Sequence, residues 1–193
     1  MSSDPFSILF VCTGNRCRSP VAEVITRTLT AGLPVEVSSA GTLPTQSMPS
    51  PVETQRAAAT LGYDLRGHSS RGLAEQDPAS ADLVIGFELG HIATAVVEYE
   101  TEASRTWLLP QLVRTLEATP SGSSDDPLVR AGKLISAAHE MRGPRPTTLE
   151  DRIADPIGRP ASVHEATARP IDDLCKRMGA GLFRTTRTVE ERP

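Results

Sequence analysis

Aromatic residues, cysteines and long apolar runs are all scarce in this sequence. Aromatic residues make up only 4% of the 193 residues, so few of them are available to line a binding site. The three cysteines, Cys12, Cys17 and Cys175, are an odd number at uneven spacing, which argues against a disulfide framework and favours a reducing compartment. No apolar run approaches the roughly 18 residues that cross a bilayer, and the first residues have no secretory signal. We therefore expect a cytoplasmic protein.

Metal ligands and basic clusters are sparse as well. The sequence has no Cys-x-x-Cys pair and no two histidines at zinc-ligand spacing, so we expect no metal and no cofactor. The net charge is −4 and no basic stripe or tail is present, which argues against nucleic acid as a partner, and no membrane partner is expected either. With 38% hydrophobic and 23% charged residues, the composition is typical of a globular chain.

Strand-like and helix-like segments alternate along the chain. The run Ser7–Val11 is short, apolar and rich in branched and aromatic residues, which predicts a buried strand. The next segment repeats apolar residues at helical spacing, and Ser19 stands where a helix cap is expected. Further strands are predicted at 35–40, 82–86 and 105–109, and further helices at 51–61, 88–98 and from Ser162 onward. This alternation predicts an α/β fold with a parallel sheet and right-handed crossovers.

One segment interrupts the alternation. Residues 118–126 are rich in Ser, Pro, Gly and Asp and predict a loop, whereas residues 128–141 have a helical pattern and residues 143–146 predict a second loop. We interpret 118–149 as a helical insertion within one domain that spans residues 1–193.

The loop between the first strand and the first helix contains the residues for a chemical reaction. Backbone N–H groups at a helix N-terminus and in a turn with Gly14 form a cavity that binds an anion. Cys12 lies at the base of this cavity, where the same field favours a thiolate. The Arg18 guanidinium can bind two oxygens of a phosphoryl group, and the Ser19 hydroxyl can donate to the thiolate. Together these groups supply what attack on phosphorus and a cysteinyl-phosphate intermediate require.

The segment from Cys12 to Pro20 reads Cys-Thr-Gly-Asn-Arg-Cys-Arg-Ser-Pro. It resembles the signature loop of the low-molecular-weight protein tyrosine phosphatases, in which Cys-x-Gly-Asn-x-Cys-Arg-Ser-Pro follows the first strand. The resemblance continues through residues 39–42, 62–71, 82–85 and 155–156. It implies a four-stranded parallel sheet flanked by helices, no metal, and two-step hydrolysis of a phosphomonoester.

The resemblance assigns a role to each matching residue. Cys12 would be the nucleophile, Arg18 the phosphate clamp, and Ser19 the group that stabilises the leaving thiolate. The loop would bind the phosphoryl group, and polar side chains would brace the loop through hydrogen bonds. The phosphate-binding residues are Thr13, Gly14, Asn15, Arg16, Cys17 and Ser19, and the bracing residues are Asn15, Ser39 and His68.

A phosphoester leaving group also needs a proton donor. The family uses an aspartate followed by proline near the C-terminus, and this chain has four such pairs, at Asp4, Asp77, Asp126 and Asp155. Asp4 lies in the N-terminal tail, and Asp77 precedes the third predicted strand. Asp126 is well placed to cap the inserted helix, with Pro127 in its first turn. Asp155 opens no helix, so we predict that it is the general acid, with Asp126 as the alternative.

The stretches that usually supply aromatic walls to the pocket of this family contain none here. Thr45 stands about where an aromatic residue is expected, and Ile157 and Gly158 directly follow the C-terminal Asp-Pro pair. We therefore predict a protein tyrosine phosphatase-type enzyme whose preference for phosphotyrosine stays open, with a phosphorylated protein or a small-molecule phosphate as partner. The alternatives are a phosphatase of a non-aromatic metabolite or of another phosphorylated residue, and a phosphate-binding regulatory module without catalysis. Arsenate reduction is disfavoured because residues 70–100 contain no cysteine.

Overall fold

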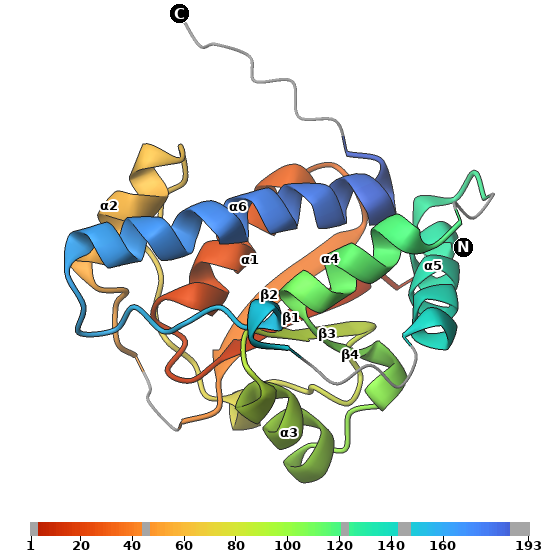
Figure 1. Ribbon diagram of the computed structural model, residues 1–193, viewed down its shortest axis with the longest axis horizontal. Helices are drawn as coiled ribbons and strands as arrows, with labels where there is room; N and C mark the ends of the chain where they lie inside the picture. Colours follow the sequence, from red (N-terminus) through yellow and green to blue (C-terminus); the bar gives the residue numbers. More distant parts are fainter. Residues whose placement is uncertain (1–3, 44–46, 121–123, 143–147, 186–193) are drawn as a thin grey trace, which may run out of the picture.

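The fold is a single parallel sheet with helices on both faces (Figure 1). The computed structural model describes residues 4–43, 47–120, 124–142 and 148–185. The strands are β1 Phe6–Cys12, β2 Val35–Gly41, β3 Leu83–Gly86 and β4 Thr106–Leu108, and they pair in parallel in the order β2-β1-β3-β4. The predicted α/β fold with a four-stranded parallel sheet is confirmed.

Six helices surround the sheet in the described part of the chain. They are α1 Arg18–Leu29, α2 Val52–Thr60, α3 Leu89–Glu98, α4 Leu109–Ala118, α5 Pro127–Met141 and α6 Ala161–Phe183. In Figure 1, α1, α4 and α6 lie on one face of the sheet and α3 lies on the other. Short 3-10 turns occur at Leu73–Glu75, Ala103–Arg105 and Leu149–Asp151.

From Ile8 to Cys12, strand β1 is buried on both faces, which is why this part of its sequence is an unbroken apolar run. Because side chains alternate along a strand, Ile8 and Phe10 join the main core with helices α1, α4 and α6. Leu9 and Val11 belong to a smaller core, to which Ala95 of α3 also belongs. The two cores fix β1 in place, so the loop that follows it lies at the carboxyl edge of the sheet, where ligand sites of α/β folds form.

One local prediction is wrong, and one helix has no counterpart among the predicted elements. Ser19 does not cap α1: the N-cap is Cys17, without a side-chain hydrogen bond, and the Ser19 hydroxyl bonds to Cys12 instead. Residues 109–118, to which no element is assigned from the sequence, form helix α4. The buried residues of α4 recur at helical spacing, and that pattern was the signal available for this helix. They are Leu109, Leu112, Val113 and Leu116.

The helix predicted within residues 118–149 is α5, and Asp126 is its N-cap. The Asp126 carboxylate accepts hydrogen bonds from the backbone N–H groups of Leu128 at 2.8 Å and Val129 at 3.2 Å. At the other end of α5, the Arg142 guanidinium lies over the Trp107 ring, 3.4 Å from its centroid. Asp126 therefore has a structural role that accounts for its Asp-Pro sequence.

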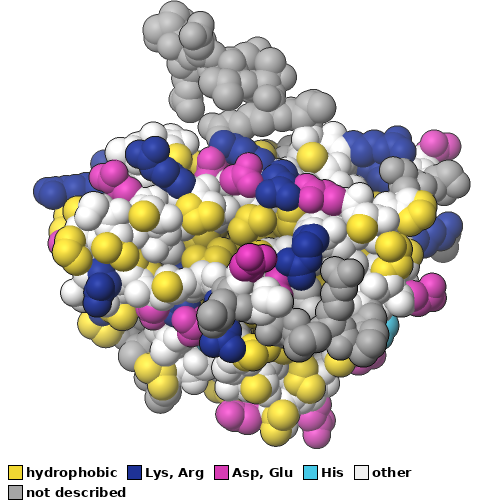
Figure 2. All heavy atoms as spheres, viewed as in Figure 1, with side chains coloured by type: hydrophobic (Ala, Val, Ile, Leu, Met, Phe, Trp, Pro, Cys, Tyr) yellow, Lys and Arg dark blue, Asp and Glu magenta, His cyan; other side chains and the backbone are white. Residues whose placement is uncertain are grey.

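Within the described ranges, no helix is long and apolar enough to cross a membrane. On the face shown in Figure 2, basic and acidic side chains are interspersed, with apolar side chains between them. This mixed pattern differs from the continuous basic surface on which nucleic acids bind.

Candidate active site

The loop between β1 and α1 is held in a strained conformation by Asn15. Asn15 is fully buried and has a left-handed backbone with φ of 49°. Its Nδ2 donates to Ser19 Oγ at 2.9 Å and to Ser39 Oγ at 2.7 Å. Its Oδ1 accepts from the Arg71 N–H at 2.9 Å, and its carbonyl accepts from His68 Nε2 at 2.7 Å. These bonds offset the backbone strain and fix the shape of the loop.

Cys12 lies at the base of the loop, beside Ser19. The Cys12 Sγ and Ser19 Oγ atoms are 3.0 Å apart, and both residues are buried. Ser19 Oγ accepts from Asn15, and its one hydrogen has two acceptors within reach, the Cys12 sulfur at 3.0 Å and the Ala40 carbonyl at 3.4 Å. The sulfur therefore has a hydroxyl group within hydrogen-bond distance.

The buried Arg18 guanidinium contacts groups from three separate parts of the chain. It forms ion pairs with Asp155 Oδ2 at 2.7 Å and with Glu88 Oε1 at 3.1 Å. It also donates to the Ile153 carbonyl at 2.9 Å and to Thr13 Oγ1 at 3.3 Å. The Asp155 side chain is 30% exposed. Its carboxyl group therefore contacts both Arg18 and the solvent that a bound substrate would displace.

Thr13 is positioned by His91, a residue that the sequence analysis did not single out. The backbone N–H groups of Phe87 and Glu88 lie 3.2 Å from His91 Nδ1, which therefore accepts and has no hydrogen. Nε2 then bears the hydrogen and donates it to Thr13 Oγ1 at 3.0 Å. Burial, with a smaller contribution from Arg18, lowers the pKa of His91 to about 3. The imidazole is thus neutral and serves to orient Thr13.

The remaining predicted loop residues occupy the rim or the packed side of the loop. Thr13, Gly14 and Arg16 are half-buried, and Arg16 Nε donates to the Pro49 carbonyl at 3.0 Å. Cys17 is buried and its sulfur accepts from Thr54 Oγ1 at 3.3 Å. Burial raises the pKa of the Cys17 thiol to about 11.

Two of the three positions where an aromatic residue is missing can be located. Ile157 is 45% exposed, and Gly158 has a φ of 70°, a left-handed conformation that favours glycine. Thr45 lies outside the described residues.

All seven aromatic residues fall within the described ranges, and they are used in the core. Six are buried: Phe6, Phe10, Tyr63, Phe87, Trp107 and Phe183. Tyr99 is half-buried against the smaller core. It directly follows the C-terminal end of α3, whereas His91 lies in the first turn of that helix. None of these seven side chains is therefore an exposed aromatic ring that could line the entrance to the loop between β1 and α1.

The site has the parts of a phosphate-transfer centre: a buried sulfur with a hydroxyl donor, an arginine and an adjacent carboxyl group. The sequence profile of the family named Low molecular weight phosphotyrosine protein phosphatase matches residues 7–130. The chain belongs to this family. Cys12, Arg18 and Glu88 lie inside the matched range, whereas Asp155 lies beyond it.

This chain resembles relatives that are named for two different substrates. The low molecular weight protein-tyrosine-phosphatase Etp of Escherichia coli strain K12 is 35% identical over 111 residues, 58% of this chain and 74% of Etp. The protein-arginine-phosphatase of Bacillus subtilis is 33% identical over 184 residues, 93% of this chain and 99% of that protein. The structure of the YwlE arginine phosphatase from Geobacillus stearothermophilus superposes with a TM-score of 0.67 at 27% identity, covering 92% and 93% of the two chains.

In this phosphatase, Gly41 allows β2 to approach the active-site loop. A Cβ atom at Gly41 would lie 2.9 Å from both the Asn15 nitrogen and the Thr13 carbonyl oxygen, which are backbone atoms that cannot turn aside. We expect Gly41→Ala to displace the loop and to lower the turnover of an aryl phosphate by about 10²-fold. The matched control is Gly132→Ala, because nothing lies within 4 Å of a Cβ at that position. Equal activities of the two variants would contradict this account.

Cys17 is predicted to protect Cys12 from irreversible oxidation. Both cysteines are free in the structure and belong to the same loop. We expect peroxide to oxidise the Cys12 thiolate to a sulfenic acid. The Cys17 sulfur then attacks the Cys12 sulfur and forms a disulfide, and the sulfenic hydroxyl group leaves as water after it takes the Cys17 proton. Mass spectrometry should show a Cys12–Cys17 disulfide that dithiothreitol reverses, in the wild type and in the control Cys175→Ser. Over-oxidised Cys12 without a disulfide would rule out this role.

Proposed function

We propose that this enzyme removes phosphate from phosphorylated protein residues through a cysteinyl-phosphate on Cys12, and that it prefers phosphoarginine to phosphotyrosine. In the first step the Cys12 thiolate attacks phosphorus, while Arg18 and the loop N–H groups bind the phosphoryl oxygens. The Asp155 carboxyl group donates its proton to the leaving atom. The contact between Arg18 and Asp155 at 2.7 Å supports this arrangement, because it brings the phosphate clamp and the acid together.

In the second step, water hydrolyses the cysteinyl-phosphate. Asp155, now a carboxylate, accepts a proton from the attacking water, and the Cys12 thiolate leaves as phosphate is released. Ser19 Oγ, 3.0 Å from the sulfur, stabilises the thiolate as it forms. No group besides the residues of the chain and water is needed to balance the reaction.

The observation that supports phosphoarginine most directly is the position of the aromatic residues. A phosphotyrosine ring gains about 0.5–1.5 kcal/mol from each aromatic side chain that stacks on it. All seven aromatic residues of this chain are buried or half-buried in the cores, so they offer no such contact. A phosphoarginine side chain does not require one.

The charges beside Arg18 also favour a cationic leaving group. When the P–N bond of phosphoarginine breaks and the nitrogen is protonated, the product is a guanidinium cation. The Asp155 and Glu88 side chains, 30% and 39% exposed, place two carboxyl groups beside Arg18. Both relatives that are named arginine phosphatases align over more than nine-tenths of this chain, in line with this proposal.

The test compares peptides of one sequence that contain phosphoarginine, phosphotyrosine or phosphoserine at the same position. We expect kcat/KM for the phosphoarginine peptide to exceed that for the phosphotyrosine peptide by about tenfold or more, the equivalent of one or two missing stacking contacts. Cys12→Ser should abolish both activities, which shows that one site is responsible. A higher kcat/KM for phosphotyrosine would refute the proposed preference and leave the chemistry intact.

A further inference from the structure

The hydroxyl oxygen of Thr13 accepts hydrogen bonds from two sides. His91 Nε2 donates to it at 3.0 Å, and Arg18 Nη2 donates to it at 3.3 Å. The direction of the first bond is fixed, because His91 Nδ1 accepts from two backbone N–H groups and the hydrogen of the neutral ring is therefore on Nε2. The direction of the second is fixed because a guanidinium group has donors only. Both lone pairs of the Thr13 hydroxyl oxygen are thus occupied.

The hydrogen of the same hydroxyl group is not used within the protein. Among the described residues, the two bonds that Thr13 Oγ1 accepts are its only hydrogen bonds, so no acceptor lies within reach of its hydrogen. Thr13 is half-buried, and part of it faces solvent. An O–H group that accepts from a cation and from an N–H group is polarised and becomes a stronger donor. Thr13 therefore presents a strengthened donor without an acceptor.

This donor lies where the phosphoryl group of the substrate binds. Thr13 directly follows Cys12, and its carbonyl accepts from the Leu43 N–H at 2.9 Å, which fixes the backbone of the residue. The Arg18 Nη2 atom that contacts the Thr13 hydroxyl also contacts Asp155 Oδ2 at 2.7 Å. Two donor atoms 3.3 Å apart can both bond to one oxygen atom. A phosphoryl oxygen bound by Arg18 Nη2 is thus within reach of the Thr13 hydroxyl.

We propose that the Thr13 hydroxyl donates a hydrogen bond to a phosphoryl oxygen of the substrate and that His91 is the positioning residue that aims it. The inference rests on the proposed function in one respect, that the loop binds a phosphoryl group. It holds for phosphoarginine and phosphotyrosine alike. Because both lone pairs of its oxygen are occupied, the Thr13 hydroxyl cannot accept from the guanidinium N–H groups of phosphoarginine, and it can serve only the phosphoryl oxygens.

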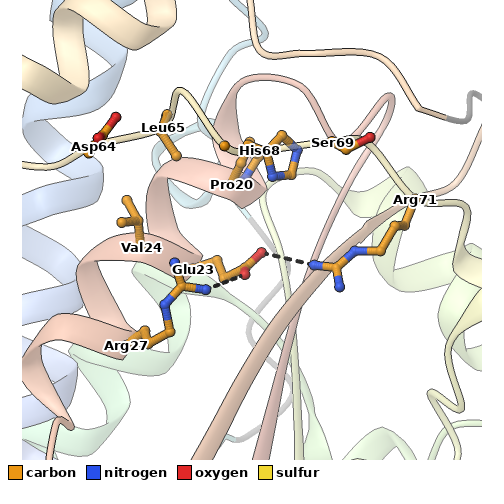
Figure 3. A pocket seen from close by; sticks show the side chains of 10 residues that line it. Pro20, Glu23, Val24, Arg27, Asp64, Leu65, His68, Ser69 and Arg71 are labelled. Atoms are coloured by element: carbon orange, nitrogen blue, oxygen red, sulfur yellow. Dashed lines mark hydrogen bonds and ion pairs between the residues drawn. The ribbon is translucent and has the colours of Figure 1, made fainter.

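Inorganic phosphate is a suitable probe, because the cavity beside the loop offers it no free cation. This cavity of about 400 Å³ lies between α1 and the loop that follows α2 (Figure 3). Two arginines line it, but in Figure 3 the Glu23 side chain lies between them and pairs with Arg27 at 2.8 Å and with Arg71 at 3.4 Å. Neither Thr13 nor His91 lines the cavity. Competition between phosphate and substrate therefore reports on the active-site loop.

The first test removes the hydroxyl group in Thr13→Val, which keeps the branched shape of the side chain. We expect the inhibition constant of phosphate to rise, and kcat/KM for p-nitrophenyl phosphate to fall, each by about tenfold or more, as when a hydrogen bond to a charged group is lost. Thr13→Ser should restore both values to within a few-fold of the wild type. The matched control is Thr115→Val in α4, where the hydroxyl group donates to the Gln111 carbonyl at 2.8 Å, and both values should be unchanged.

The proton itself distinguishes a donor to phosphate from a group that only holds Arg18 in place. In the free chain the Thr13 hydroxyl proton exchanges with water and should be absent from the ¹H spectrum. With saturating phosphate it should become visible, and the signal should be missing in Thr13→Val. An inhibition constant that rises in Thr13→Val without such a signal in the wild type would overturn the contact.

His91→Asn tests the positioning role. Asparagine supplies an oxygen near the place of Nδ1, which can still accept from the N–H groups of Phe87 and Glu88, but it has no donor at the place of Nε2. We expect kcat/KM to fall a few-fold in His91→Asn alone and not to fall further when His91→Asn is added to Thr13→Val. Burial lowers the pKa of His91 to about 3, so the ratio of wild type to His91→Asn should be constant between about pH 5 and 8.

The outcomes separate this inference from the proposed function. A wild type that hydrolyses p-nitrophenyl phosphate and is inhibited by phosphate, with the same constants in Thr13→Val, would overturn the inference alone. A wild type without turnover and without phosphate binding would overturn the proposed function. Equal losses from His91→Asn in the presence and absence of the Thr13 hydroxyl would show that His91 does not act through Thr13.

Discussion

The Cys12→Ser variant is expected to lose the turnover of an aryl phosphate by at least about 10⁴-fold, as nucleophile replacements do when catalysis is covalent. A serine hydroxyl stays protonated at neutral pH, so the loop N–H groups and Ser19 have no anionic nucleophile to stabilise. The change replaces one small side chain by another at a position that is 2% exposed, and the thermal unfolding midpoint should therefore move only slightly.

Cys175→Ser is the matched control for this prediction. Cys175 is completely buried in α6 and takes no part in the loop. Its replacement should affect stability as much as Cys12→Ser does, while turnover per folded molecule stays at the wild-type level. If Cys12→Ser retains activity within a few-fold of the wild type, Cys12 is not the nucleophile.

The Asp155→Asn variant is expected to hydrolyse esters of poor leaving groups about 10²–10⁴-fold more slowly, the usual contribution of a general acid. An asparagine retains a carbonyl oxygen that can accept from Arg18, so the loop should keep its shape. It has no proton to give to the departing oxygen. A phosphate ester of a very acidic phenol, which leaves without protonation, should therefore suffer much less, and the ratio of the two rates is the measurement.

Asp126→Asn supplies the comparison, because Asp126 also precedes a proline. Its carboxylate caps α5 through the N–H groups of Leu128 and Val129, and asparagine is an equally good cap. We expect unchanged turnover for both esters. Equal losses for good and poor leaving groups in Asp155→Asn would move the acid role to another residue, and Asp126 would then be the first to reconsider.

What the sequence predicted correctly is mostly local. The strand β1, the position of the loop between β1 and α1, and the cap at Asp126 are each set by neighbours in the chain. Ser39 and His68 were proposed only through the resemblance to the family, and the structure places both in hydrogen bonds to Asn15.

The residues that were missed act across long separations in the chain. Glu88 contacts Arg18 and His91 contacts Thr13 only because β3 pairs with β1, which brings the ends of the two strands to the same edge of the sheet. Neither residue stands in a motif. Their signal was a position directly after a predicted parallel strand, where site residues of this fold class gather.

The error at Ser19 has a similar cause. A serine before proline at the start of a helix is a common cap, and only the tertiary contact with Cys12 shows that its hydroxyl is used elsewhere.

The central claim, a covalent phosphoenzyme on Cys12, is tested most directly by mass spectrometry of a rapidly denatured reaction mixture. During turnover of a phosphoarginine peptide, the enzyme peptide that contains Cys12 should contain one phosphoryl group, and this group should disappear when the substrate is exhausted. In the Cys12→Ser variant mixed with the same substrate, this peptide should show no phosphoryl group that appears and then disappears as the substrate is consumed. A phosphoryl group on another residue, or full turnover with Cys12 never modified, would contradict the account.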